Sequence, residues 1–341
     1  MKAKVRILSL VLLLSIFVVS CGDEEFVVPE ASAPEEDILT ADKSAKNAIN
    51  ASSSQLTSHF RNWLSANGYG SYNFAGGPGR SYGGRTSNSD PVNNHPVIFI
   101  HGNGDKAVGT STSQSGWTAS IDYFLSKGYR SSELYAMTWG PASLSQTPLQ
   151  YHSRSYIDRI RRFIQAVKAY TGASRVDVIG HSMGVTLARK AIKGGTAYDQ
   201  AIGGYYNVGS RLSYVDTFVG IAGANYGLTS CFFSGTSIPT CSDRNGFYPG
   251  YLYFGAGPYG VSEFLTGLNN NSSKEGTYVY SLWSTVDEVI GGGTLVYGRY
   301  TCRIPRQNGE RVFTSFPYGH WGVKDRTGYQ QWRMVKYHRT N

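Results

Sequence analysis

The segment Arg175–Lys193 reads RVDVIGHSMGVTLARKAIK and is the most informative stretch of the chain for predicting its fold. It starts with a short apolar run that predicts a buried β-strand, and residues 183–193 predict a helix. The turn between them, residues 180–184, is Gly-His-Ser-Met-Gly and has the pattern G-x-S-x-G. A serine in this pattern projects its hydroxyl from a turn so tight that small residues must flank it. The segment predicts Ser182 as a nucleophile; the alternative is an ordinary β–α turn with an incidental serine.

Strand-like and helix-like segments alternate along the rest of the chain. The predicted strands are 96–100, 133–139, 175–179, 214–221, 278–284 and 311–315, and the predicted helices are 116–127, 156–170, 183–193 and 329–338. This repeated order predicts an α/β fold with a mostly parallel sheet and helices on both faces.

Two segments precede or interrupt this body. Residues 43–94 begin with helical spacing that stops at Gly68, and a Gly-, Ser- and Asn-rich loop follows over residues 76–94. We therefore start the α/β body at residue 95. Residues 225–276 are a long connection rich in Tyr and Phe, and connections of this length inside a compact domain are usually functional. We interpret it as a cap or rim over the site; the alternative is a self-contained loop packed on its own aromatic rings.

The first forty-two residues predict export. A basic start and an apolar run over residues 7–19, too short to span a membrane comfortably, predict a signal peptide at 1–20. Cys21, directly after it, resembles the lipidated cysteine of a bacterial lipobox. The acidic residues 21–42 would then tether a lipoprotein at the outer membrane or cell surface. The alternative is simple secretion, with Cys21 incidental.

The charge distribution and the motifs argue against nucleic-acid and metal binding, and the cysteines predict one disulfide. The net charge is +9, but residues 1–42 carry three basic and eight acidic residues, so the rest carries +14. No nucleic-acid-binding motif accompanies this charge, and we expect a solvated basic surface with no nucleic-acid partner. No metal-ligand spacing occurs, so we expect no metal and no cofactor. Cys231 and Cys241 flank a short segment and predict a disulfide, which leaves Cys302 as a free thiol.

A serine nucleophile needs a base, and in this fold the acid and then the histidine follow the serine along the chain. Of the two downstream histidines, His338 lies in the last predicted helix and His320 in a Gly-flanked loop, so we choose His320. Asp287 follows the strand at 278–284 in a turn and is the predicted acid. The rival acids are less well placed: Glu288 beside it, Asp216 inside a strand, Asp243 in the long connection and Asp325 beyond the histidine.

An ester-cleaving serine also needs two N–H groups for the charge that develops on the substrate oxygen. We expect one from Met183, the residue after the nucleophile. The other is expected from the loop at 101–104 (HGNG), whose glycines permit close backbone approach and in which Asn103 is the donor. His101 precedes the nucleophile, and we interpret it as a structural loop residue.

Together these motifs resemble the class 2 lipases, which are small triacylglycerol lipases and esterases. Residues 96–102 (PVIFIHG), the Gly-His-Ser-Met-Gly turn, Asp287 and His320 carry the resemblance, which spans residues 95–335. Residues 101–105 (HGNGD), the stretch 226–231 with Cys241, and Gly319-His320 also resemble lipase-like extracellular polyhydroxybutyrate depolymerases.

The resemblance implies an α/β-hydrolase fold with Ser182 as nucleophile, His320 as base and Asp287 as its partner. It implies Asn103 and Met183 as the oxyanion donors. No aspartate pair resembles the calcium site of some related lipases, so a metal is again not expected.

We therefore expect an exported serine hydrolase that cleaves hydrophobic carboxylic esters through an acyl-enzyme. An extracellular polyester depolymerase of the polyhydroxybutyrate type is the alternative among enzymes. The alternative from another class is a non-catalytic binding lipoprotein with a hydrolase fold, which the loss of a triad residue would have favoured.

Overall fold

The structure is a computed structural model, and it describes residues 54–341. The predicted signal peptide, Cys21, the acidic tether and the first part of the predicted helix at 43–68 lie outside the described residues. Within residues 54–341, no helix combines the length and the apolar character that crossing a membrane requires.

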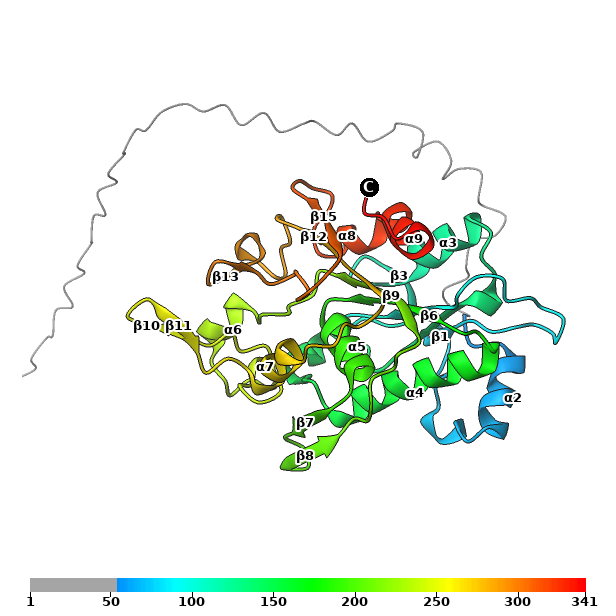
Figure 1. The fold of residues 1–341 in the computed structure, drawn as a ribbon, viewed down its shortest axis with the longest axis horizontal. Helices are drawn as coiled ribbons and strands as arrows, with labels where there is room; N and C mark the ends of the chain where they lie inside the picture. Colours follow the sequence, from blue (N-terminus) through cyan, green and yellow to red (C-terminus); the bar gives the residue numbers. More distant parts are fainter. Residues whose placement is uncertain (1–53) are drawn as a thin grey trace, which may run out of the picture. The chain divides into compact units, whose positions relative to one another are not determined.

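A central sheet of seven strands organises the described part of the chain (Figure 1). Its spatial order is β1 (Ser81–Tyr82), β5 (Leu134–Met137), β2 (Val97–Ile100), β6 (Val176–His181), β9 (Val215–Ile221), β12 (Tyr278–Ser284) and β15 (Gly309–Phe313). β1 is antiparallel to β5, and all the other neighbours are parallel. The predicted mostly parallel sheet is confirmed, and the carboxyl ends of its parallel strands meet at one edge.

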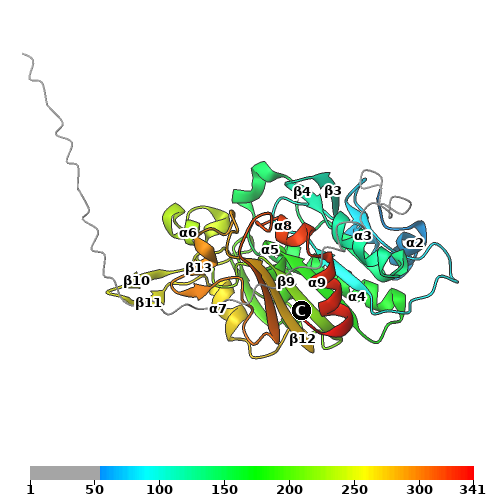
Figure 2. The ribbon, with the colours of Figure 1, turned by 90° about the horizontal axis from the view of Figure 1, so that it is seen from above.

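Helices cover both faces of this sheet (Figures 1 and 2). One layer holds α2 (Ser58–Ala66), α4 (Arg154–Thr171) and α5 (Met183–Lys193), and the other holds α3 (Thr118–Ser126), α8 (Gly322–Asp325) and α9 (Gly328–Tyr337). Side chains of the buried strand β2 alternate between the layers. Ile98 and Ile100 join the first hydrophobic cluster, and Val97 and Phe99 join the second.

Residues 54–94 pack against α4 and the edge of the sheet. The Thr57 hydroxyl caps α2 by accepting a hydrogen bond from the Phe60 N–H (3.2 Å), and Phe60 stacks on Tyr170 of α4 with 4.2 Å between ring centroids. The prediction of a plain loop at 76–94 is wrong for β1, which joins the central sheet. Two residues are too few to show a period, so only the pairing with β5 reveals this strand.

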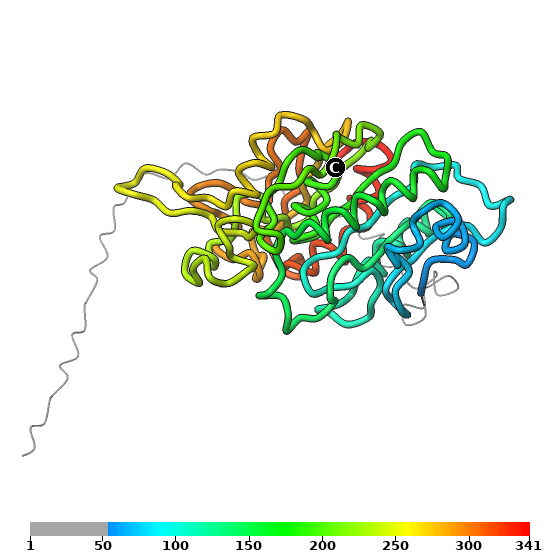
Figure 3. The backbone as a smooth tube through the Cα atoms, turned by 90° about the horizontal axis from the view of Figure 1, so that it is seen from below, coloured from blue at the N-terminus to red at the C-terminus, as the bar shows by residue number. Residues whose placement is uncertain are grey.

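The long connection at residues 225–276 leaves β9 and returns at β12. It holds α6 (Thr229–Ser234), the 3-10 helix η4 (Pro239–Cys241), a hairpin of β10 (Tyr251–Tyr253) and β11 (Ala256–Tyr259), and α7 (Glu263–Asn270). The hairpin projects away from the sheet and its helices (Figure 3). The predicted disulfide joins Cys231 and Cys241, and Cys302 is free and buried. Burial raises the pKa of the Cys302 thiol well above its usual value.

Shorter elements connect the layers. Three small hairpins pair β3 (Val108–Ser111) with β4 (Gln114–Gly116), β7 (Thr196–Asp199) with β8 (Gly204–Asn207), and β13 (Leu295–Val296) with β14 (Arg299–Tyr300). The remaining 3-10 helices are η1 (Gly70–Tyr72), η2 (Ser131–Glu133), η3 (Leu144–Leu149) and η5 (Gly292–Thr294).

Candidate active site

Ser182 occupies a strained turn between β6 and α5. Its backbone has φ 53° and ψ −128°, a region that non-glycine residues rarely adopt and that costs about 1–3 kcal/mol. The Ser182 N–H donates to the Ile221 carbonyl at the end of β9 (2.9 Å), which anchors the turn to the sheet. The serine is thus held at the carboxyl edge of the sheet, at the first turn of a helix.

The glycines of the turn are required by close backbone contacts. A Cβ on Gly180 would lie 3.0 Å from the Val185 Cα, and one on Gly184 would run into the carbonyl groups of Ile100 and His101. The helix therefore begins directly against the end of β2. This contact explains physically why small residues flank the serine.

The loop after β2 lies against the nucleophile. A Cβ on Gly102 would lie 2.9 Å from the Ser182 Cβ and 3.0 Å from His181 Nδ1, so glycine alone permits this approach. The next residue, Asn103, is fixed through its side chain, whose Nδ2 donates to the Thr147 carbonyl (3.0 Å). Met183, the first residue of α5, carries one of the N–H groups that a helix leaves unpaired at its start.

His101 has a structural environment. Its Nδ1–H donates to the Gly102 carbonyl (2.7 Å), and its Nε2 accepts from the Trp139 N–H (3.1 Å). The ring also stacks on Trp139 with 4.9 Å between centroids. Burial lowers the pKa of His101 to about 4, so the ring is neutral at pH 7.

His320 and Asp287 form a buried pair at the same edge of the sheet. His320 Nδ1 lies 2.8 Å from Asp287 Oδ2, and both residues are 3% exposed. A carboxylate only accepts, so Nδ1 carries the proton and Nε2 remains as the basic nitrogen. The other Asp287 oxygen accepts from the N–H groups of Val289 (3.0 Å) and Ile290 (2.7 Å), which fixes the carboxylate.

The neighbouring carboxylate of Glu288 has a different partner. Glu288 Oε2 accepts from the backbone N–H of His320 (2.8 Å), so it holds the loop and not the ring. On the other side, His181 Nε2–H donates to the His320 carbonyl (3.0 Å), and the two rings lie 4.6 Å apart. Burial, with His320 and Lys324 nearby, lowers the pKa of His181 well below its usual value and keeps it a neutral donor.

A buried lysine joins the His320 segment to the loop after β2. Lys324 of α8 is fully buried, and its Nζ lies 3.5 Å from Asp105 Oδ2 and 2.9 Å from Asp325 Oδ1. It also donates to the Ser115 hydroxyl (2.7 Å) and to the Gly116 carbonyl. The loop that carries His320 and the loop that carries Asn103 are therefore fixed to one another.

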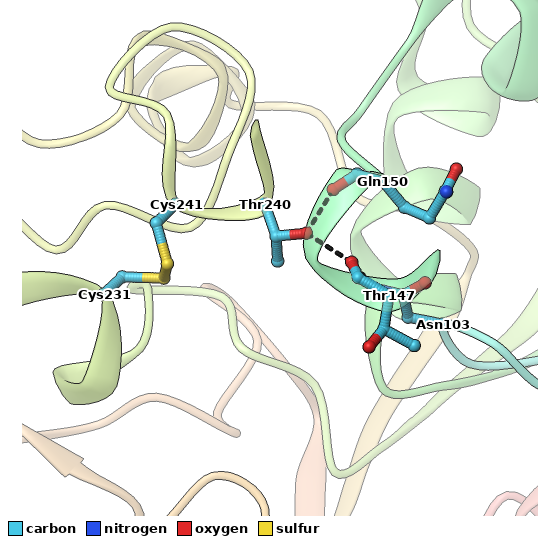
Figure 4. The surroundings of a disulfide bond; sticks show 6 residues. All are labelled: Asn103, Thr147, Gln150, Cys231, Thr240 and Cys241. Atoms are coloured by element: carbon cyan, nitrogen blue, oxygen red, sulfur yellow. Dashed lines mark hydrogen bonds between the residues drawn. A yellow bond between two sulfur atoms is a disulfide. The ribbon is translucent and has the colours of Figure 1, made fainter. Parts of the chain in front are cut away.

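The long connection is tied to the same place (Figure 4). Thr240, next to the disulfide, lies with its Oγ1 2.6 Å from the Thr147 carbonyl oxygen and 2.5 Å from that of Gln150. The Thr147 oxygen is the one that also accepts from Asn103. A chain of contacts thus runs from the disulfide to the loop beside Ser182.

The other downstream histidine lies at the opposite edge of the sheet. His338 Nε2 is 3.1 Å from Asp216 Oδ2, at the start of β9. Asp216 also belongs to the one group within residues 54–341 that could hold a metal ion, with His95 and Asp177. His95 Nδ1 lies 3.8 Å from an oxygen of each carboxylate, and Arg175 pairs with Asp216 (2.9 Å). Burial raises the pKa of Asp177 well above its usual value. These residues lie at the amino ends of the strands, away from Ser182.

The sequence model described as "Lipase (class 2)" matches residues 94–333. The chain belongs to the class 2 lipase family. The fold of this class 2 lipase is the α/β-hydrolase fold, as predicted, and the family makes it a carboxylic ester hydrolase of the lipase and esterase type.

Three solved structures resemble it at low identity. Lipase B of Aspergillus fumigatus is 14% identical, with a TM-score of 0.46, and the match covers 74% of this chain and 54% of that one. Mature lipase BlEst2 of Bacillus licheniformis is 13% identical, with a TM-score of 0.44 and coverages of 75% and 98%. A truncated carbohydrate esterase from gut microbiota is 13% identical, with a TM-score of 0.44 and coverages of 71% and 85%. No curated protein sequence matches this class 2 lipase.

Three residues that fix the site of this class 2 lipase were not predicted as such. His181 stood in the motif only as a neighbour of the serine, Glu288 only as a rival acid, and Lys324 not at all. Nothing in their local spacing distinguishes them, because each acts on a segment far away in the sequence. Lys324 begins the charged run Lys324-Asp325-Arg326, which suggests an exposed surface, so its burial could not be predicted from the sequence.

Proposed function

We propose that this class 2 lipase is an exported serine ester hydrolase that works through an acyl-enzyme on Ser182. The strained Ser182 turn, next to a buried Asp287–His320 pair whose backbone contacts His181, carries the proposal. In the first step the Ser182 hydroxyl attacks an ester carbonyl while His320 Nε2 takes its proton. The same histidine then returns the proton to the departing alcohol.

Asp287 holds the imidazole in the tautomer that this step needs. Its Oδ2 accepts from Nδ1–H and stabilises the imidazolium that forms, while two backbone N–H groups neutralise part of its charge. Water then attacks the acyl-enzyme with His320 as base, and the acid leaves with Ser182 restored.

The N–H groups of Met183 and Asn103 would bind the oxyanion in both steps. Support comes from the closeness of residue 102 to Ser182 and from the side-chain bond that fixes Asn103. Loss of one such donor typically raises the barrier by about 3–4 kcal/mol.

We propose a neutral, hydrophobic ester as the substrate, with triglyceride-type lipids first and a polyhydroxyalkanoate polyester as the alternative. The family supports a hydrophobic ester, and no charged group stands among the proposed catalytic atoms except the Asp287 carboxylate. Export through the signal at 1–20, with lipidation at Cys21, is part of the proposal. The Cys231–Cys241 disulfide supports an oxidising compartment.

The test compares the full-length chain with its Ser182→Ala variant on three substrates: a soluble short-chain ester, emulsified long-chain triglyceride and amorphous polyhydroxybutyrate. We expect hydrolysis that the variant loses by about 10⁴-fold or more. The preferred substrate then separates lipase, esterase and depolymerase. No hydrolysis of any ester by the unaltered protein would favour the non-catalytic binding lipoprotein, and full activity of the variant would overturn the mechanism.

A further inference from the structure

We propose that the β10–β11 hairpin, α6 and β13 form an adsorption surface for a water-insoluble, uncharged ester phase. We call this surface the aromatic face, and its members are Phe232, Phe233, Tyr251, Leu252, Tyr253, Phe254, Tyr259 and Leu295. The inference rests on the proposed function and adds how the enzyme reaches its substrate. In this inference the aromatic residues bind the bulk substrate phase and take no part in the bond cleavage at Ser182.

The aromatic face concentrates the exposed apolar side chains of the described residues. Eight of the fifteen large hydrophobic side chains that are exposed within residues 54–341 belong to it, and Phe254 is 92% and Phe233 80% exposed. Rings also pair within it: Tyr253 with Phe254 (4.6 Å between centroids) and Phe232 with Phe233 (5.4 Å). Exposed apolar side chains concentrated on a few linked elements are typical of an interaction site.

The chemistry of the hairpin points to an uncharged partner. Residues 245–262 contain no Asp, Glu, Lys, Arg or His, although the chain has 55 charged residues in all. Exposed hairpin edges normally carry charges, especially Lys, that prevent association with other apolar surfaces. Their absence fits a neutral apolar phase and offers nothing to an anionic lipid or a charged protein surface.

The turn of the hairpin presents a ring at an unfavourable backbone position. Phe254 has φ 46° and Gly255 φ 76°, so both central residues are in the left-handed region. Asn-Gly is the usual pair for such a turn because a bulky side chain strains it. The Phe254 ring pairs with Tyr253 but is 92% exposed, so this packing leaves most of its surface in solvent. Contact of the ring with an apolar phase would bury that surface and offset the strain.

The base of the aromatic face is held firmly while its rings stay free. The Tyr297 hydroxyl donates to the Gly250 carbonyl at the start of the hairpin (2.7 Å), and the Thr229 hydroxyl donates to the Leu295 carbonyl (3.2 Å). These bonds link the hairpin, β13 and α6, and the disulfide adds a covalent link within the connection. Figures 1 and 3 show the hairpin extended beyond the rest of the described chain.

The aromatic face and Ser182 arise from the same edge of the sheet. The connection that carries the hairpin follows the carboxyl end of β9, and Ser182 follows that of the neighbouring strand β6. Thr240 ties this connection to the Thr147 carbonyl beside Asn103. An enzyme held at a surface by these rings would therefore keep a fixed geometry between the surface and its catalytic groups.

The test uses full-length protein in the Ser182→Ala background, so that adsorption is measured without hydrolysis. The variant Phe233→Ser/Tyr253→Ser/Phe254→Asn removes three exposed rings, and Asn-Gly at the tip suits the turn. The control Ile202→Asn/Tyr337→Ser removes two exposed apolar side chains elsewhere (54% and 51% exposed). Binding to triolein droplets and to polyhydroxybutyrate granules is measured by flotation or sedimentation.

We expect at least a tenfold loss of binding to one of these phases for the aromatic-face variant and less than a twofold change for the control. With Ser182 present, the same substitutions should leave hydrolysis of a soluble ester within twofold. Unchanged adsorption would overturn the proposal, as would an equal loss in the control or a parallel loss of soluble-ester hydrolysis. Two further results would overturn it: a dimer that becomes a monomer on substitution, and preferential binding to phosphatidylcholine vesicles. The adsorption assay needs no catalysis, so its result can be distinguished from a failure of the proposed catalytic mechanism.

Discussion

The proposed catalytic edge, which comprises Ser182, His181, Asp287 and His320, and the aromatic face arise from the same edge of the sheet but are built in opposite ways. At the catalytic edge Asp287, His181 and His320 are buried, and each has at least one hydrogen bond from or to a distant segment. On the aromatic face the backbone is bonded at its base while the rings stand in solvent. Proton transfer needs side chains fixed to within a fraction of an ångström, whereas adsorption needs only exposed apolar area on a firm support.

The two regions also differ in what substitutions should do. Changes at the catalytic edge should alter rate or stability strongly and on every substrate. Changes on the aromatic face should alter only adsorption to insoluble substrate and its hydrolysis. Variants in each region test this difference, and their expected effects span several orders of magnitude.

The largest effect separates two neighbouring carboxylates. Asp287→Asn should lower kcat about 10⁴-fold, because an amide in that position no longer holds the Nδ1–H tautomer of His320. Glu288→Gln should lower it about tenfold or less, because Gln still offers an oxygen to the His320 N–H. Steady-state kinetics on a soluble ester measures both. The opposite ranking would make Glu288 the catalytic acid.

Acidification should lower the free energy of unfolding of the whole fold. Burial lowers the pKa of His101 to about 4, of His152 to about 3 and of His181 well below its usual value. Below pH 6.5 these histidines are protonated in the unfolded chain but remain neutral in the folded protein. The free energy of unfolding therefore falls as the pH drops, by about 1.4 kcal/mol per pH unit for each histidine. Asp177, whose pKa burial raises, acts in the opposite direction because the folded carboxyl binds a proton more readily than the unfolded one.

Urea unfolding between pH 7 and pH 5 measures that slope, and we expect the free energy of unfolding to fall on acidification. His152 lies under the long connection, where it bonds the Asn245 carbonyl (2.6 Å) and Thr186 (2.7 Å). His152→Gln, which can make both bonds, should reduce the slope by one histidine. A flat or reversed slope would contradict the assignment of these rings as neutral.

The buried lysine should matter for the catalytic edge as a whole. Lys324→Met should lower the free energy of unfolding by about 3–5 kcal/mol, because it leaves the buried Asp105 carboxylate without its cation. Lys336→Met on the surface of α9 is the matched control, and it should change stability by less than about 0.5 kcal/mol. Chemical denaturation measures both variants. Equal small effects would show that Lys324 does not join the two loops energetically.

The smallest effect concerns the contact between the two regions. Thr240→Val keeps the side-chain shape but removes the hydroxyl that bonds the Thr147 carbonyl, so Asn103 loses part of its support. We expect kcat to fall about fivefold with KM within twofold, which matches one lost hydrogen bond of about 1 kcal/mol. Thr229→Val, in the same connection but bonded to Leu295, is the control. An unchanged kcat in Thr240→Val would leave the two regions independent.

Much of the fold was predictable because its signals are local. Five of the six long strands of the sheet carry apolar runs, with β15 (GERVF) as the exception. Helix α4 carries one apolar stripe, and the glycines around Ser182 indicate a tight turn. Strand β1 and the hairpin β10–β11 were not predicted. Two-residue and three-residue strands have no measurable period, and their pairing depends on partners elsewhere.

Local sequence was enough to predict the fold class, the family and Ser182 as nucleophile, because strand, turn and helix follow one another within nineteen residues. The order of residues along the chain predicted His320 as the base and Asp287 as the acid. The three-dimensional arrangement was needed to learn that Asp287 contacts the His320 ring, that Glu288 contacts the His320 backbone, and that Lys324 reaches a segment 208 residues away. Adjacent residues look alike in a sequence, and contacts across such separations depend on how the whole sheet brings its loops to one edge.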